Sequence, residues 1–70
     1  MRRLVTTEAV IEELGGVKSI AKLAGAKYVT AHHWKQSGSF PARTYVLLTS
    51  LLAERNCRAP DSLWNMLDRA

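Results

Sequence analysis

The sequence predicts an all-α protein, a small bundle of five short helices. Apolar residues recur at intervals of three and four along most of the chain, which is the spacing of a helix face buried in a core. The strict alternation of apolar and polar residues that is typical of strands is nearly absent. Short breaks rich in glycine or proline separate the helical patterns, and 70 residues are enough for one domain. We therefore expect residues 1–70 to form a single helical domain.

The first three helices are expected at about residues 7–14, 17–24 and 27–36. Thr6 or Thr7 can cap the first helix, because a hydroxyl oxygen can accept a hydrogen bond from a free N–H of the first turn. Gly15-Gly16 and Gly25 end the first two helices, since glycine tolerates the left-handed geometry of many helix ends. The apolar positions expected to face inward are Val10, Ile11, Leu14, Val17, Ile20, Ala21, Ala24, Tyr28, Ala31 and Trp34.

A fourth helix is expected at about residues 41–55, after the loop at 37–39. It opens at Phe40-Pro41, because proline suits a first helical position. Residues 60–62 can start a last short helix with Leu63, Trp64 and Leu67. The fourth helix has more apolar residues than one stripe needs, and two explanations are open. Either the fifth helix folds back over it within one subunit, or a two-fold dimer covers it.

The distribution of charge is more informative than the net charge of +4. Between Leu14 and Ala53 there is no aspartate or glutamate, and every charged residue is basic: Lys18, Lys22, Lys27, Lys35 and Arg43. A positive segment between mixed ends is the electrostatic pattern expected of a protein that binds a polyanion. The alternative is a solvated basic surface that serves only solubility.

Helices two and three, joined at Gly25, are predicted to form a helix-turn-helix over residues 17–36. Ala21 provides a small residue where the helices cross, Gly25 provides positive φ, and Trp34 provides a large inward anchor. The opposite side of the second helix has no core to fill. Its residues follow the i, i+3, i+4, i+7 spacing and are Val29, His32, His33 and Gln36.

The segment IAKLAGAKYVTAHHWKQSGSFPARTYVLL resembles the helix-turn-helix of small Cro/cI-like phage and prophage regulators, and it is closest in form to the YdaS-like group. The resemblance covers about residues 14–52 and is carried by Ala21, Gly25, Trp34, Gly38 and Phe40-Pro41. The chain departs from the family pattern at two positions. Lys27 stands where many members have a capping serine, and Ala31 stands where a β-branched residue is usual.

The resemblance implies that helix three enters the major groove of DNA. Gln36 can pair with adenine, His32 and His33 can donate to guanine or phosphate, and Val29 can meet a thymine methyl. Contacts to the DNA backbone are expected from Lys18, Lys27, Tyr28, Thr30, Lys35 and Arg43. The alternative for His32 and His33 is that they are solvated surface residues without a DNA contact. The alternative for Tyr28 is that its side chain points partly inward. Arg2 and Arg3 could form a basic arm, or else a frayed terminus.

These observations predict a sequence-specific regulator of transcription that binds double-stranded DNA, with a repressor of phage or prophage type as the first choice. We expect a homodimer on palindromic DNA, in the cytoplasm of a bacterium or infected host and associated with the nucleoid. The alternatives are an antitoxin or accessory DNA-binding component of a two-gene module, and a protein-interaction module that does not bind DNA.

An enzyme, a metal site and a cofactor are not expected. No nucleophile with a base, carboxylate pair or phosphate-binding glycine loop is recognisable in the sequence. His32 and His33 are adjacent on a helix and point about 100° apart, so they cannot easily chelate one ion. Cys57 is the only cysteine, which excludes an internal disulfide and fits a reducing compartment. No apolar run approaches the roughly 20 residues that span a membrane, and we expect no signal peptide.

Overall fold

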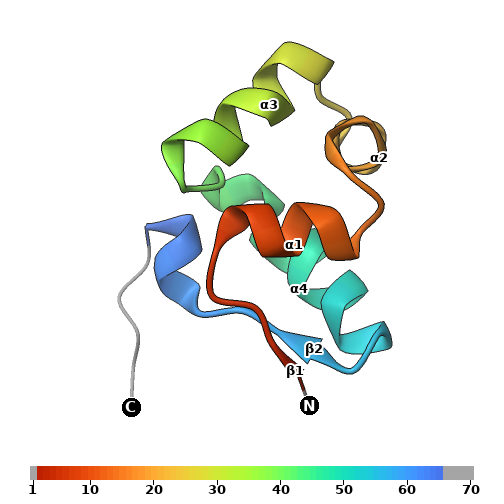
Figure 1. The fold of residues 1–70 in the computed structure, drawn as a ribbon, viewed down its shortest axis with the longest axis vertical. Coiled ribbons are helices and arrows are strands. Elements are labelled where there is room, and N and C mark those ends of the chain that lie inside the picture. The colour runs from red at the N-terminus through yellow and green to blue at the C-terminus, as the bar shows by residue number, and fades with distance from the viewer. Residues whose placement is uncertain (1, 66–70) are drawn as a thin grey trace.

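The computed structural model describes residues 2–65, and this part of the chain is mostly helical, as predicted (Figure 1). None of its helices is long and apolar enough to cross a membrane. The elements are β1 (Arg2–Arg3), α1 (Thr7–Glu13), α2 (Val17–Ala24), α3 (Tyr28–Ser37), the 3₁₀ turn η1 (Ala42–Thr44), α4 (Tyr45–Glu54), β2 (Cys57–Arg58) and the 3₁₀ turn η2 (Asp61–Trp64).

The first three helices lie within one residue of their predicted bounds. Thr6 is the N-cap of α1, and its hydroxyl oxygen accepts a hydrogen bond from the Ala9 N–H at 3.1 Å. Gly25 ends α2 in the left-handed conformation with φ of 66°. Helix α3 starts at Tyr28, because Lys27 is extended and serves as the N-cap, with no side-chain capping bond. The capping rules therefore place these helices well.

The fourth helix is shorter than predicted, and Pro41 is not part of it. The backbone of Pro41 is extended, with φ −68° and ψ 144°, and η1 precedes α4. The Phe40 N–H donates to the Leu63 carbonyl oxygen at 2.7 Å, which holds the chain extended before the turn. The Thr44 hydroxyl also donates to the Pro41 carbonyl oxygen at 2.7 Å. One contact from far along the chain, at Leu63, and one local contact, at Thr44, thus accompany the later start of the helix.

The predicted fifth helix is a 3₁₀ turn over residues 61–64. Asn65 follows it in the left-handed conformation with φ of 58°, which ends the helical path. Leu67, which was expected in this helix, lies outside the described residues. The predicted count of five helices is therefore not confirmed: residues 2–65 contain four α-helices, and a 3₁₀ turn stands at the predicted fifth.

A pair of two-residue strands is a further departure from the all-helical prediction. β1 and β2 pair in parallel, with Arg2 opposite Cys57 and Arg3 opposite Arg58. The Leu4 N–H also donates to the Arg58 carbonyl oxygen at 2.7 Å. Two residues are too short to show an alternating pattern, so the sequence gives no strand signal. Residues 2–3 are thus neither a frayed terminus nor a free arm.

An aromatic cluster fills the core between α3, η1 and the C-terminal segment. The Phe40 ring lies 6.0 Å from Trp34 and 5.2 Å from Trp64, measured between ring centroids. The Trp64 indole N–H donates to the Thr44 hydroxyl oxygen at 3.1 Å, and Tyr45 meets Trp64 edge to face. Trp64 therefore packs against the start of α4, and Leu48 and Leu52 of that helix are buried in the same core cluster.

Candidate nucleic-acid interface

Helices α2 and α3 pack against each other across a three-residue turn. Ile20 and Ala21 are the buried residues of α2, and both belong to the core cluster. The Ala26 N–H donates to the Ala21 carbonyl oxygen at 2.8 Å, which closes the end of α2. A Cβ atom added to Gly25 would meet no heavy atom within 4 Å. Glycine is therefore required here by its positive φ and not by lack of space.

Ala31 and Trp34 anchor α3 to the core. Ala31 is completely buried and Trp34 is 6% exposed. Trp34 meets Phe40 edge to face, with an interplanar angle of 75°. Because these two residues are the buried ones of α3, the side of the helix that faces the core is narrow. The remaining residues of the helix are left to the surface.

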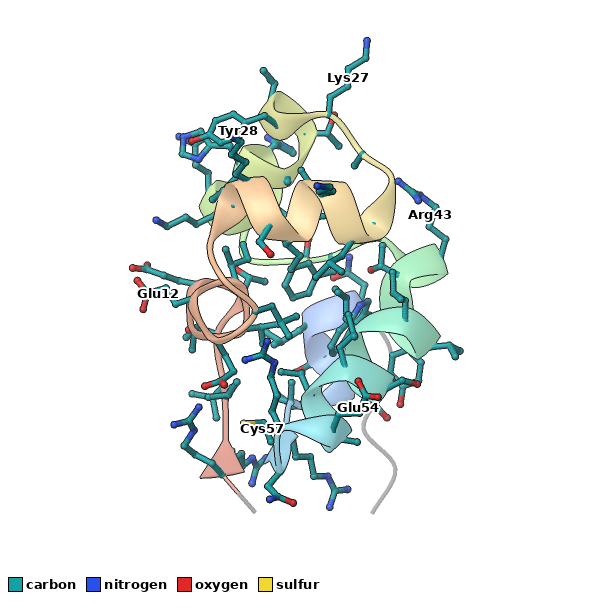
Figure 2. The ribbon with its side chains drawn as sticks, turned by 90° about the vertical axis from the view of Figure 1, so that its right-hand side faces the viewer. Glu12, Lys27, Tyr28, Arg43, Glu54 and Cys57 are labelled. Atoms are coloured by element: carbon teal, nitrogen blue, oxygen red, sulfur yellow. The ribbon has the colours of Figure 1, made fainter. Side chains whose placement is uncertain are left out.

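Tyr28 is not an inward residue, so this part of the predicted stripe is wrong. Its side chain is 56% exposed, and its ring stacks on His32 with centroids 6.2 Å apart and an interplanar angle of 30°. As the first residue of α3, it lies beyond the edge of the core (Figure 2). The hydroxyl group of Tyr28 therefore belongs to the outer surface.

The predicted outward face of α3 is exposed. Val29 is 78% exposed. The other three residues of the face, His32, His33 and Gln36, are exposed too, and so is Thr30. The outer surface of α3 therefore carries the apolar side chain of Val29 and several side chains that can form hydrogen bonds.

Exposed or half-buried cations lie on α3 and on the elements next to it in the chain. Lys27 is exposed at the N-terminus of α3, Lys18 is exposed on α2, and Lys35 is half-buried in the last turn of α3. Arg43 is exposed on η1, and its guanidinium donates to the Ala24 carbonyl oxygen at 3.4 Å. Within residues 2–65, none of these cations is joined to a carboxylate. The positive charge on this side is thus not neutralised by ion pairs.

Lys22 is a further exposed cation, and it was not among the predicted contacts. It lies in the last turn of α2. Its charge was visible in the acid-free segment, but the sequence gives no sign of how close it lies to α3. That distance depends on how α2 and α3 pack, and this packing depends on the whole core.

Arg2 and Arg3 lie at the other end of the molecule from α3 (Figure 1). The Arg2 guanidinium pairs with the Glu13 carboxylate and also donates to the Cys57 sulfur at 3.6 Å. Arg55 approaches the same carboxylate at 3.5 Å. The structure therefore does not bring the predicted basic arm together with the other predicted contacts.

An open groove of about 360 Å³ runs between α4 and the segment that follows it. Neither α2 nor α3 contributes to its lining, which consists of Tyr45, Thr49, Leu52, Ala53, Cys57, Arg58, Ala59 and Asp61. The Tyr45 hydroxyl donates to an Asp61 carboxylate oxygen at 2.7 Å across this groove. In the described part of the chain, no three His, Cys, Asp or Glu side chains gather as they would around a metal ion.

Comparison of the chain with protein-family models, with curated proteins and with solved structures finds no match. The geometry of α2, α3 and their cations is therefore the basis for a functional interpretation.

Proposed function

We propose that this protein is a sequence-specific regulator of transcription that binds double-stranded DNA. In this proposal α2 and α3 act as a helix-turn-helix, and α3 enters the major groove. The observation that carries the proposal is the exposed, acid-free outer face of α3, held in place by Ala31 and Trp34 and bordered by cations. An α-helix is of a size that fits the major groove of B-form DNA.

The chemistry of the outer face suits direct reading of base edges. The Gln36 amide can donate and accept toward an adenine, and the imidazoles of His32 and His33 can donate to the acceptors of a guanine. Val29, exposed on the same face, suits contact with a thymine methyl. The Tyr28 ring, stacked on His32, limits the orientations open to that imidazole. These four base-reading positions are the source of sequence preference in the proposal.

The bordering cations suit phosphate contacts, which set affinity and register. Contacts from Lys18, Lys27, Lys35 and Arg43 would release about four counterions for each protomer. The slope of log affinity against log salt concentration would then be about −3.6 for one protomer and about −7 for two. Tyr28 and Thr30 can add neutral hydrogen bonds to the backbone without changing this slope.

Selection from a random duplex library by the purified chain tests the proposal. We expect a recovered motif with two-fold symmetry, because a regulator of this type reads a palindrome as a homodimer. His33→Ala should then relax the preference at one position of each half-site, by about 1–3 kcal/mol of discrimination. Recovery of no motif, or a motif unchanged by substitutions in α3, would show that the proposal is wrong.

Alanine substitution of one cation separates the phosphate contacts from the base contacts. Lys27→Ala should weaken binding to all sequences alike and reduce the magnitude of the salt slope by about 0.9 per protomer. Arg58→Ala is the matched control, because Arg58 is an exposed cation on β2, far from α3 (Figure 1). We expect Arg58→Ala to leave the slope unchanged. Equal effects of the two substitutions would contradict the placement of the interface.

A further inference from the structure

The outward side of α4, with the η1 residue before it, forms a surface that we call the α4 face. It consists of Arg43, Val46, Leu47, Ser50 and Glu54, and all five residues are exposed. Arg43, Leu47, Ser50 and Glu54 recur at intervals of four, three and four residues and so follow one line along the helix. Val46, three residues after Arg43 and four before Ser50, lies beside this line. Val46 is 73% exposed and Leu47 is 39% exposed. The apolar centre of the α4 face is therefore open to solvent.

The other apolar residues of α4 are accounted for by the core. Leu48 and Leu52 are buried, and Tyr45 and Leu51 are partly buried against the core cluster. The core thus takes up one side of the helix only. Val46 and Leu47 are therefore the large apolar residues of α4 that the core does not bury.

The two ends of the α4 face have opposite charges. Arg43 lies at one end and Glu54 at the other, as Figure 2 shows. Neither is joined to an opposite charge within residues 2–65. One Arg43 N–H donates to the Ala24 carbonyl oxygen, which leaves the other guanidinium donors available. A small residue, Ser50, lies between the apolar pair and the carboxylate.

We propose that the α4 face binds the α4 face of a second copy of this chain, with the two helices antiparallel. A two-fold interface uses the same patch twice, so that patch must complement itself. In the antiparallel arrangement Arg43 lies opposite Glu54 of the second copy, and Leu47 lies opposite the small Ser50. A parallel arrangement would instead place Arg43 against Arg43 and Glu54 against Glu54. The charges therefore select the antiparallel dimer.

The dimer is weak, because its apolar centre consists of two side chains in each copy. Interfaces of this extent fall below the roughly 1,200 Å² of total buried area typical of stable complexes. If the proposed function is also correct, palindromic DNA would add to this association by holding two protomers side by side. Arg43 would then face Glu54 and not a phosphate, so three cations per protomer would remain and the salt slope for two protomers would be about −5.4. The association itself does not depend on the proposed function.

Charge reversal in the absence of DNA tests the dimer. Self-association is measured by sedimentation of the full chain at concentrations up to about 1 mM. Arg43→Glu and Glu54→Arg should each weaken self-association about tenfold, because each places like charges opposite one another twice. The double variant should recover it. An equimolar mixture of the two single variants should also associate, because each mixed dimer restores both opposite-charge pairs.

The matched control is Glu12→Arg, which reverses an exposed carboxylate on α1, away from the α4 face (Figure 2). It should leave self-association unchanged. Leu47→Gln keeps both charges and should weaken association, which provides a second reading if Arg43→Glu fails to fold. A chain that stays monomeric at the highest concentration, or single variants that are not restored by mixing, would overturn the proposal. Because no DNA is present, these results are independent of whether the chain binds DNA.

Discussion

Substitution of Trp34 by alanine tests whether this residue holds α3 on the core. Trp34 is 6% exposed and contacts Phe40, so its ring is removed from water almost completely. A buried aromatic side chain of roughly 200 Å² contributes about 5 kcal/mol at about 25 cal/mol per Å². Substitutions of buried tryptophan or phenylalanine by alanine cost about 3–5 kcal/mol. We therefore expect Trp34→Ala to lower the free energy of unfolding by about 3–5 kcal/mol.

A loss of this size is large for this chain. Stability of about 0.05–0.15 kcal/mol per residue gives about 4–10 kcal/mol for 70 residues. The variant should therefore lose about a third of the total stability or more. Urea denaturation followed by far-UV circular dichroism at low temperature measures the difference from the unsubstituted chain.

Tyr28→Ala is the matched control, since it also removes an aromatic ring from α3. Tyr28 is 56% exposed, so we expect a loss of less than about 1 kcal/mol. A loss from Tyr28→Ala as large as that from Trp34→Ala would refute the orientation of α3. A loss below about 1 kcal/mol from Trp34→Ala would refute the anchoring role of the indole.

Three further changes test local features of the fold by denaturant unfolding. Gly25→Ala should cost about 1–2 kcal/mol, because alanine is strained at positive φ although space is available; an unchanged midpoint would contradict the turn. Thr44→Val should cost about 1–3 kcal/mol by leaving the Trp64 indole N–H without its acceptor, and a neutral effect would contradict that hydrogen bond. Thr6→Ala should cost about 1 kcal/mol by removing the cap of α1, whereas Thr6→Asn should largely retain the stability.

Local sequence signals predicted the first half of the fold accurately. Thr6, Gly15-Gly16 and Gly25 act through contacts within a few residues, so the bounds of α1 and α2 could be inferred from the chain alone. The outward position of Val29 could be inferred for the same reason, because helical spacing fixes it relative to Trp34.

The second half of the fold depends on contacts between distant residues. Pro41 looked like a first helical residue, yet the bond between Phe40 and Leu63 keeps the chain extended there. The β1–β2 pair joins residues 55 positions apart, and two-residue strands carry no periodicity. Arg2 was predicted to belong to a basic arm or a frayed terminus, but it pairs with Glu13, eleven positions along the chain.

The outcome for Tyr28 depends on where the core ends. Its spacing from Ala31 and Trp34 fits an inward stripe, and only the three-dimensional arrangement shows that the helix extends past the core at Tyr28. Helical periodicity gives the direction of a side chain, but it does not give the extent of the core.

Titration of the isotope-labelled chain with its selected duplex, followed by the amide resonances, tests the central claim most directly. We predict that the largest shifts occur in α3, at Val29, His32, His33 and Gln36, with smaller shifts near Lys18 and Lys27. Residues of the β1–β2 pair, at the other end of the molecule, should be unaffected (Figure 1). Shifts that cluster at β1 and β2 and leave α3 unchanged would contradict the account.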